Sequence, residues 1–151
     1  MTPTPKPIKK QTNKKPNKKI KWLIYTVLVG LIPIASRLLV WFVTGRDAVN
    51  LFTASDCTSF GLVLHISNIN EIEHIILSDT SWKTIQNGTS IVFIAFYSVL
   101  FALTLFGEID ESAIEVTTIN YCTLLLAIIS LITSYTVYHR ISYWEARGMI
   151  K

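Results

Sequence analysis

Apolar residues gather into four long stretches along this sequence, and short polar segments separate them. The stretches cover residues 22–43, 51–69, 89–106 and 116–138. A helix needs about 20 predominantly apolar residues to cross the hydrocarbon core of a bilayer. The second stretch is the weakest, because it opens with the polar run LFTASDCTSF before it becomes apolar. The pattern predicts an all-α integral membrane protein, a four-helix transmembrane bundle in which each stretch is one span.

Composition narrows the class of protein further. Of the 151 residues 50% are hydrophobic, the mean hydropathy is +0.43, and the apolar residues are segregated into long stretches. Together these features favour one integral membrane domain over a water-soluble one. The two cysteines, Cys57 and Cys122, lack pair spacing and a neighbouring histidine cluster. They are expected to be small buried packing residues, and no metal or cofactor is expected. Neither a serine, histidine and acid set nor a glycine-rich phosphate loop is found, so we expect no enzyme.

Charge is distributed unevenly along the chain. Eight of the fourteen basic residues are lysines within residues 1–21, a segment without apolar periodicity. We expect a disordered cytoplasmic tail that attracts anionic lipid headgroups and does not bind nucleic acid directly. The loop 107–115 has acidic residues but no basic one, which places it outside the cytoplasm, and residues 139–151 form a second cytoplasmic tail. The prediction is a multi-pass membrane protein with both termini in the cytoplasm.

The first stretch carries a charge that a simple anchor does not need. With the N-terminus inside, Arg37 lies about 15 residues into the first span, which leaves roughly 8 Å to the outer face. Asp56 enters the second span from that face and lies at a similar depth. An unpaired charge in hydrocarbon costs at least a few kcal/mol. We predict that Arg37 and Asp56 pair or face a shared wet cavity. The alternative is that Arg37 reaches the headgroups and Asp56 lies near a fraying helix start.

Two residues weaken the middle of the first span. Pro33 removes a backbone hydrogen bond and Gly30 lies a turn earlier, so a bend is expected near mid-membrane. The bend is either a hinge or a static kink that neighbouring helices accommodate. Three polar residues of the second and fourth spans fall in the outer half of the bundle: Ser59, Thr117 and Asn120. They either join helices through hydrogen bonds or line a shallow vestibule open to the outside.

The inner surface is the expected output side. An apolar stripe at helical spacing, Ile66, Ile69, Ile72 and Ile76, predicts that the second helix continues past the membrane with a solvated acidic face. Residues 86–88 are expected to break the chain before the third span. Partner docking is predicted at acidic residues after the second span and at aromatic and basic residues near the C-terminus: Glu71, Glu73, Asp79, Tyr143, Trp144 and Arg147.

The layout as a whole resembles a known family. A lysine-rich tail (KPIKKQTNKKPNKKIK), four short spans, almost no domain outside the membrane and the acidic loop GEIDESAIE resemble the small membrane subunit of the bacterial Kiwa anti-phage system. The resemblance implies a homo-oligomer, with a tetramer among the candidates, that senses phage attachment or envelope perturbation. It also implies a cytoplasmic DNA-binding partner subunit that blocks phage replication or expression. No diagnostic motif aligns, so no site residue is carried over.

The function expected from these patterns is that of a non-enzymatic sensor or scaffold within an oligomer. A signal from the envelope would bias the bent first helix, and the output would pass through the inner surface. The main alternative is a small oligomeric ion channel or pore with Arg37, Asp56 and Asn120 along its path. A holin-like permeabilising protein is a third interpretation, which predicts growth arrest when the chain is expressed alone.

Overall fold

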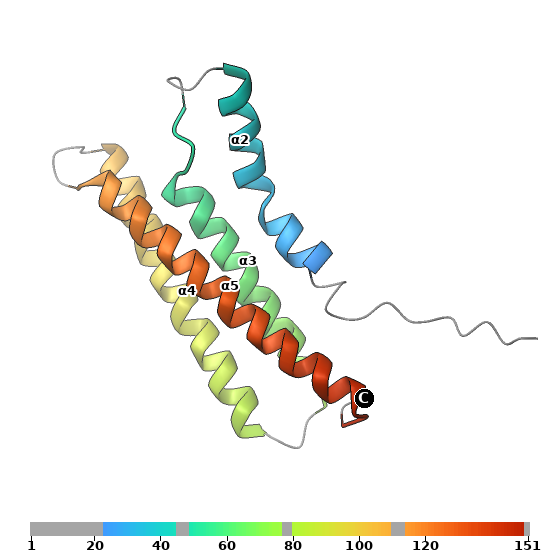
Figure 1. The fold of residues 1–151 in the computed structure, drawn as a ribbon. Coiled ribbons are helices and arrows are strands. Elements are labelled where there is room, and N and C mark those ends of the chain that lie inside the picture. Colours follow the sequence, from blue (N-terminus) through green and yellow to red (C-terminus); the bar gives the residue numbers. More distant parts are fainter. Residues whose placement is uncertain (1–22, 45–48, 77–79, 110–113, 150–151) are drawn as a thin grey trace, which may run out of the picture.

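The computed structural model describes residues 23–44, 49–76, 80–109 and 114–149, and in these ranges every regular element is a helix. The polybasic tail predicted for residues 1–21 lies outside them. Figure 1 shows the elements in chain order: the π-helical segment η1 (Leu23–Leu28), α2 (Ile32–Thr44), α3 (Ala54–Glu73), α4 (Thr80–Ile109) and α5 (Val116–Ala146).

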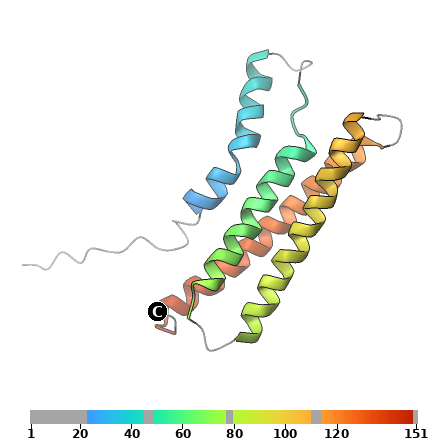
Figure 2. The ribbon, with the colours of Figure 1, turned by 180° about the vertical axis from the view of Figure 1, so that it is seen from behind.

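Helices α3, α4 and α5 run side by side as a bundle, and η1 and α2 lie against α3 (Figures 1 and 2). The C-termini of α2 and α4 and the N-termini of α3 and α5 lie at one end, which we call the cavity end. The opposite end holds the C-terminus of α3, the N-terminus of α4 and the C-terminus of α5, and we call it the C-terminal end. Figures 1 and 2 show α2 leaning away from α4 and α5. The described N-terminal segment therefore packs mainly against α3.

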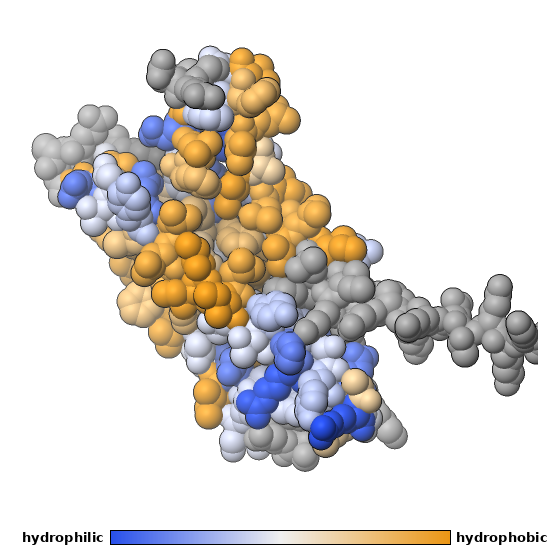
Figure 3. Space-filling model, in the orientation of Figure 1, coloured by the Kyte–Doolittle hydropathy of each residue, from blue (hydrophilic) through white to orange (hydrophobic). Residues whose placement is uncertain are grey.

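Two of the helices are long and apolar enough to cross a membrane, namely residues 80–107 of α4 and 116–146 of α5. At 1.5 Å per residue the 30 residues of α4 extend about 45 Å, which exceeds the thickness of a hydrocarbon core. The helix α2 is apolar but shorter. In Figure 3 apolar residues cover α2 and the middle of the visible face, whereas polar residues gather at the C-terminal end. This distribution is the one expected of an apolar belt with a polar rim.

The helix α3 turns small and polar residues toward its neighbours. These buried positions recur every three or four residues and include Cys57, Thr58, Gly61, His65 and Asn68. The predicted apolar stripe does not form one buried face, because Ile66 and Ile76 are 58% and 77% exposed and Ile72 alone of the four isoleucines is fully buried. The His65 and Asn68 side chains hydrogen-bond to α5, whereas the buried Thr58 hydroxyl has no hydrogen-bond partner among the described residues. Apolar side chains of α3 such as Ile66 lie on the outside.

The first apolar stretch is interrupted where glycine and proline predict a bend. The α-helix restarts at Ile32, after a turn at Leu31. Pro33 lies in the first turn of α2, where its missing N–H group is tolerated. Gly30 is buried against α3, and a Cβ atom at this position would come within 3.0 Å of Phe60 Cδ2. Gly30 therefore permits a close approach of two helices in addition to the bend.

The prediction that residues 86–88 break the chain is wrong. They lie inside α4, which begins at Thr80. A glycine within a helix costs only about 1 kcal/mol relative to alanine, and Gly88 has open space around it. Trp82, in the first turn of α4, is 8% exposed and packs among apolar residues of α3 and α5. This packing outweighs the weak local preference for a turn.

The C-terminal segment also differs from its prediction as a tail. Residues 139–146 continue α5, which ends at Ala146. Ile141 is fully buried, and Trp144 packs against the same apolar cluster as Trp82. Contacts with the first turn of α4 thus extend the helix beyond the predicted span end at residue 138.

Candidate functional site

An ion pair joins α2 to α3 at the cavity end. Arg37 Nε donates a hydrogen bond to Asp56 Oδ2, and Thr53 Oγ1 donates to the same oxygen at 2.9 Å. The two charged side chains are 29% and 13% exposed. Asp56 lies in the first turn of α3, where the partial positive charge of the helix N-terminus favours a carboxylate. The structure thus brings together the two residues that the depth argument placed at one level.

Asn120 of α5 fixes the start of α3. Its Oδ1 atom accepts a hydrogen bond of 2.7 Å from the backbone N–H of Ala54, the first residue of α3. The Thr53 side chain, at the N-cap position, makes no capping bond, so a residue from another helix satisfies one of the free N–H groups of the helix start. The other two residues of the predicted polar cluster are not part of this arrangement. Ser59 is exposed and donates to Ser55 of its own helix, and Thr117 is exposed.

A cavity of about 660 Å³ opens beside the ion pair, between α2, α3, α4 and α5. Its wall contains Arg37, Asn120 and Thr53 together with Glu115 at the start of α5. Below this level the buried side chains of α3 fill the space between the helices. Of the three residues predicted to line a vestibule, Asn120 lines this cavity, whereas Ser59 and Thr117 do not.

A polar seam runs down the bundle below the cavity and joins α3 to α5. His65 Nε2 lies 2.9 Å from Ser130 Oγ, and Asn68 Nδ2 donates to Ser134 Oγ at 2.8 Å. All four side chains are fully buried. Each of these bonds ties one turn of α3 to the facing turn of α5, so the register between the two helices is fixed by polar contacts.

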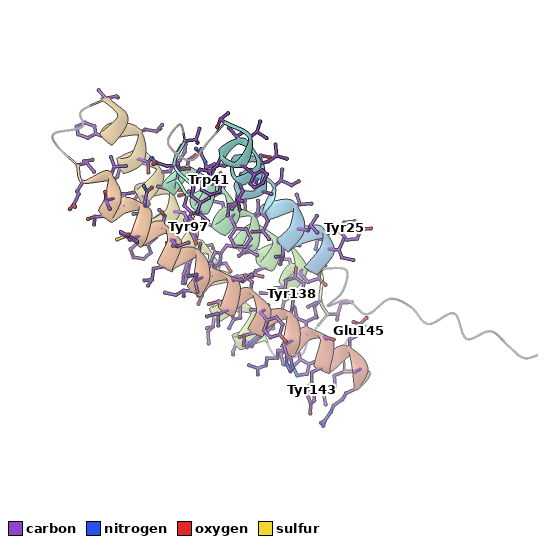
Figure 4. The ribbon with its side chains drawn as sticks, turned by 45° about the horizontal axis from the view of Figure 1, so that its top comes forward. Tyr25, Trp41, Tyr97, Tyr138, Tyr143 and Glu145 are labelled. Atoms are coloured by element: carbon purple, nitrogen blue, oxygen red, sulfur yellow. The ribbon has the colours of Figure 1, made fainter. Side chains whose placement is uncertain are left out.

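The helix α4 hydrogen-bonds to the seam through Tyr97, and Phe93 of the same helix stacks on His65 with ring centres 4.5 Å apart. Tyr97 is fully buried, and its hydroxyl lies 2.9 Å from Ser130 Oγ, the atom that also contacts His65 (Figure 4). The Tyr97 ring lies over Gly61, where any Cβ atom would overlap it. The Ser130 hydroxyl is thus the point at which three helices meet.

Replacing Ser130 with alanine should lower the free energy of unfolding by about 1 to 2 kcal/mol, because it leaves the His65 nitrogen and the Tyr97 hydroxyl without their shared partner. The measurement is a detergent-denaturant titration followed by helical circular dichroism. Ser98→Ala is the matched control, since the Ser98 hydroxyl is exposed and only donates to Ile94 of its own helix. Equal stability of the two variants would show that the seam does not hold the bundle together.

A second polar contact ties the N-terminal segment to the bundle. Thr26 Oγ1 of η1 lies 3.0 Å from Ser67 Oγ of α3, which in turn lies 3.0 Å from the Tyr138 hydroxyl of α5 (Figure 4). Together with the pair of Arg37 and Asp56, this chain of hydroxyls holds the segment at two separated points. The apolar contacts between them include Gly30 against α3.

The residues predicted to dock a partner differ in how accessible they are. Tyr143 and Arg147 are exposed at the C-terminal end, with the Arg147 guanidinium 4.4 Å from the ring centre of Tyr143. Trp144 is instead half-buried, and its ring centre lies 4.9 Å from the ring centre of Trp82. Glu73 is exposed at the end of α3, Glu71 is half-buried, and Asp79 lies outside the described residues.

Sequence reasoning missed the polar seam, although a signal for it was present. Ser130 and Ser134 stand four residues apart in an otherwise apolar helix, and His65 and Asn68 are spaced to share one face of α3. Polar residues inside an apolar helix face the bundle interior as a rule, and this rule predicts the pairing of the two faces. Cys122 is exposed whereas Cys57 is buried, so the prediction of two buried cysteines holds for Cys57 only.

The described polar side chains of the bundle make hydrogen bonds and an ion pair. No group of three or more potential metal ligands occurs in the part of the chain that the structure describes. No family model matches the chain, and neither a curated protein nor a solved structure shows significant similarity to it. A functional interpretation therefore rests on the ion pair, the cavity and the surfaces at the two ends.

Proposed function

We propose that the chain is a four-span protein of the bacterial inner membrane that works without catalysis, as the sensor or scaffold subunit of an anti-phage complex. The observation that carries the proposal is the attachment of the N-terminal segment. η1 and α2 lie against α3, and the polar contacts of their described residues include the ion pair of Arg37 with Asp56 and the hydroxyl chain that begins at Thr26. The remaining helices are interlocked through a buried seam. A movable element on a fixed bundle is the arrangement that a sensor requires.

The distribution of apolar surface supports the membrane assignment. Two helices have the length and hydropathy of spans, and α2 is apolar over most of its exposed surface. Together η1 and α2 cover residues 23–44, which is about the length that a bilayer requires. In the proposed topology the lysine-rich N-terminus and the C-terminal end face the cytoplasm, and the cavity end faces outward.

The cavity is where a signal from the envelope acts in this proposal. A stimulus shifts a conformational equilibrium only when it interacts differently with the two states. The cavity wall contains Arg37 of α2 and Asn120 of α5, so a change in envelope contacts at this level alters the position of α2 relative to the bundle. The output passes to a DNA-binding partner at the C-terminal end, within a homo-oligomer of the chain.

Docking of the partner is expected to depend on the exposed pair Tyr143 and Arg147. Replacing both with alanine should weaken binding of the proposed cytoplasmic DNA-binding partner by about 30-fold, because exposed tyrosine and arginine side chains are frequent centres of binding energy. The measurement is an affinity titration with the detergent-solubilised chain. Tyr121→Ala is the control, since Tyr121 is an exposed tyrosine near the other end of the same helix. Unchanged affinity in the double variant would refute the docking surface.

A small oligomeric channel remains the second candidate, and the cavity is the observation that favours it. Arg37 and Asn120 line the cavity at the cavity end, two of the three residues that the channel interpretation places along its path. The buried residues of α3 close this space within one subunit, so a conducting path would have to run between subunits. Currents in reconstituted bilayers that change with Asp56→Asn would favour the channel over the sensor.

A further inference from the structure

Arg140 of α5 is held in an unusual setting at the C-terminal end. Its guanidinium carbon lies 4.8 Å from the ring centre of Trp144 and 5.3 Å from that of Trp82. The two rings meet edge to face at 4.9 Å, and Trp82 is anchored in the apolar cluster between α3, α4 and α5. The charge of Arg140 is therefore positioned by two aromatic rings, although the residue lies on the surface.

Stacking leaves the hydrogen-bonding capacity of Arg140 unused. A guanidinium that lies over a ring keeps its N–H donors in its own plane, where they can bind a carboxylate or phosphate with two parallel bonds. Within the described ranges no carboxylate forms an ion pair with Arg140. A positioned cation with which no described carboxylate forms an ion pair points to an anionic ligand.

A pocket of about 240 Å³ lies beside this cation, between α4 and α5. Its lining near Arg140 includes Gln86 and Thr136, and it continues toward the middle of the bundle to Thr133 and Ile132. The two threonine hydroxyls donate at 2.9 Å to carbonyls of their own helix, so they remain able to accept, and the Gln86 amide supplies further donors. The pocket thus has a polar, cationic end and an apolar end.

The apolar end continues onto the open surface of α5. Ile132 and, one turn earlier, Ile128 are 61% and 51% exposed. An inorganic phosphate ion would make no use of this apolar path. A lipid would use this apolar path, because its acyl chain follows the exposed isoleucines while its phosphate reaches Arg140. Tryptophans and basic pockets between helices are typical of the headgroup level of a membrane.

We propose that Arg140 and the adjoining pocket bind the phosphate of an anionic phospholipid in the cytoplasmic leaflet. This inference rests on the proposed membrane location but not on sensing or partner recruitment. The site is distinct from the lysine-rich N-terminal tail, since it is formed by α4 and α5. Its effect is to bridge the two helices at the end where the partner docks, so that the lipid stabilises the C-terminal end of the bundle.

The test measures binding of dioctanoyl phosphatidylglycerol to the full chain in detergent micelles, by native mass spectrometry and by the shift in melting temperature. Dioctanoyl phosphatidylcholine and inorganic phosphate are the comparison ligands. Phosphatidylglycerol should bind and raise the melting temperature, whereas the other two should not. Arg140→Gln should weaken its binding by at least about tenfold. Arg147→Gln, which removes the same charge from the ring of Tyr143, should bind like the wild type.

Several outcomes would overturn the inference. Equal binding by the wild type and Arg140→Gln would remove Arg140 from the site, and an equal effect of inorganic phosphate would show a general anion site in place of a lipid site. Should Arg140→Gln fail to fold, Arg140→Lys serves, since it retains the charge without the planar fork, and undiminished binding would contradict the proposed geometry. Lipid binding that persists while partner recruitment fails would refute the proposed function and leave this site intact.

Discussion

Replacing Gly61 with alanine should destabilise the protein by about 2 to 4 kcal/mol, the largest effect expected of any single methyl group in this chain. A Cβ atom at Gly61 would overlap the ring of Tyr97, which is fully buried. The ring must then move, and its hydroxyl loses Ser130. The helices α3 and α4 are forced apart at the level where three helices share hydrogen bonds, so the loss exceeds that of an ordinary overpacked site.

The measurement for Gly61→Ala is the free energy of unfolding in mixed micelles, with helicity followed by circular dichroism. Gly88→Ala is the matched control, because Gly88 lies within α4 with nothing near its side-chain position. Its stability should be unchanged or raised by up to about 1 kcal/mol through helix propensity. If Gly61→Ala were as stable as Gly88→Ala, the packing of Tyr97 over Gly61 would be refuted.

Removing one partner of the ion pair between Arg37 and Asp56 should destabilise the attachment of α2 by about 3 kcal/mol, because a charge is left uncompensated in partly buried surroundings. Arg37→Asp and Asp56→Arg are the single variants, and the combination restores opposite charges. The rescue should be partial, since an arginine at position 56 faces the positive end of the α3 dipole and loses the bond from Thr53.

The effect of this charge swap is measured as the free energy of unfolding in mixed micelles and as the amount of chain in the membrane fraction. The double variant should lie between the wild type and the worse single variant. A double variant as defective as the worse single variant would mean that the two charges do not act on each other. Lys83→Gln provides a comparison, since Lys83 is a cation that donates to the Ile75 carbonyl at the end of α3 and has no part in the pair.

The hydropathy pattern predicted much of the fold, and its failures have identifiable causes. Helix content, the start of α5 at Val116 and the break near Pro33 follow from apolar length and from backbone chemistry. The start of α4 does not, because the local turn preference of residues 86–88 is overruled by Trp82 packing on α5. The hydropathy of one segment cannot predict its contact with a segment that is distant in the sequence.

The candidate site was likewise predicted from the sequence in part only. Counting residues along the predicted first and second spans placed Arg37 and Asp56 at one depth, and the structure joins the two side chains in an ion pair. The role of Asn120 at the start of α3 depends on the rotation of α5 about its axis, which spacing alone does not determine. Likewise, the burial of Trp144 against Trp82 separates it from its exposed neighbour Tyr143, although both were predicted to dock a partner.

The central proposal is that α2 is a movable element held on the bundle by Asp56, and an electron-paramagnetic-resonance distance measurement in bilayers tests it most directly. One spin label goes on the exposed native Cys122 of α5 and the other on Val43→Cys of α2, whose native side chain is exposed, with the buried Cys57 replaced by alanine. With Asp56 intact, the account predicts one narrow distance distribution. With Asp56→Asn it predicts a broader distribution shifted to longer distances, and an unchanged distribution in that variant would contradict it.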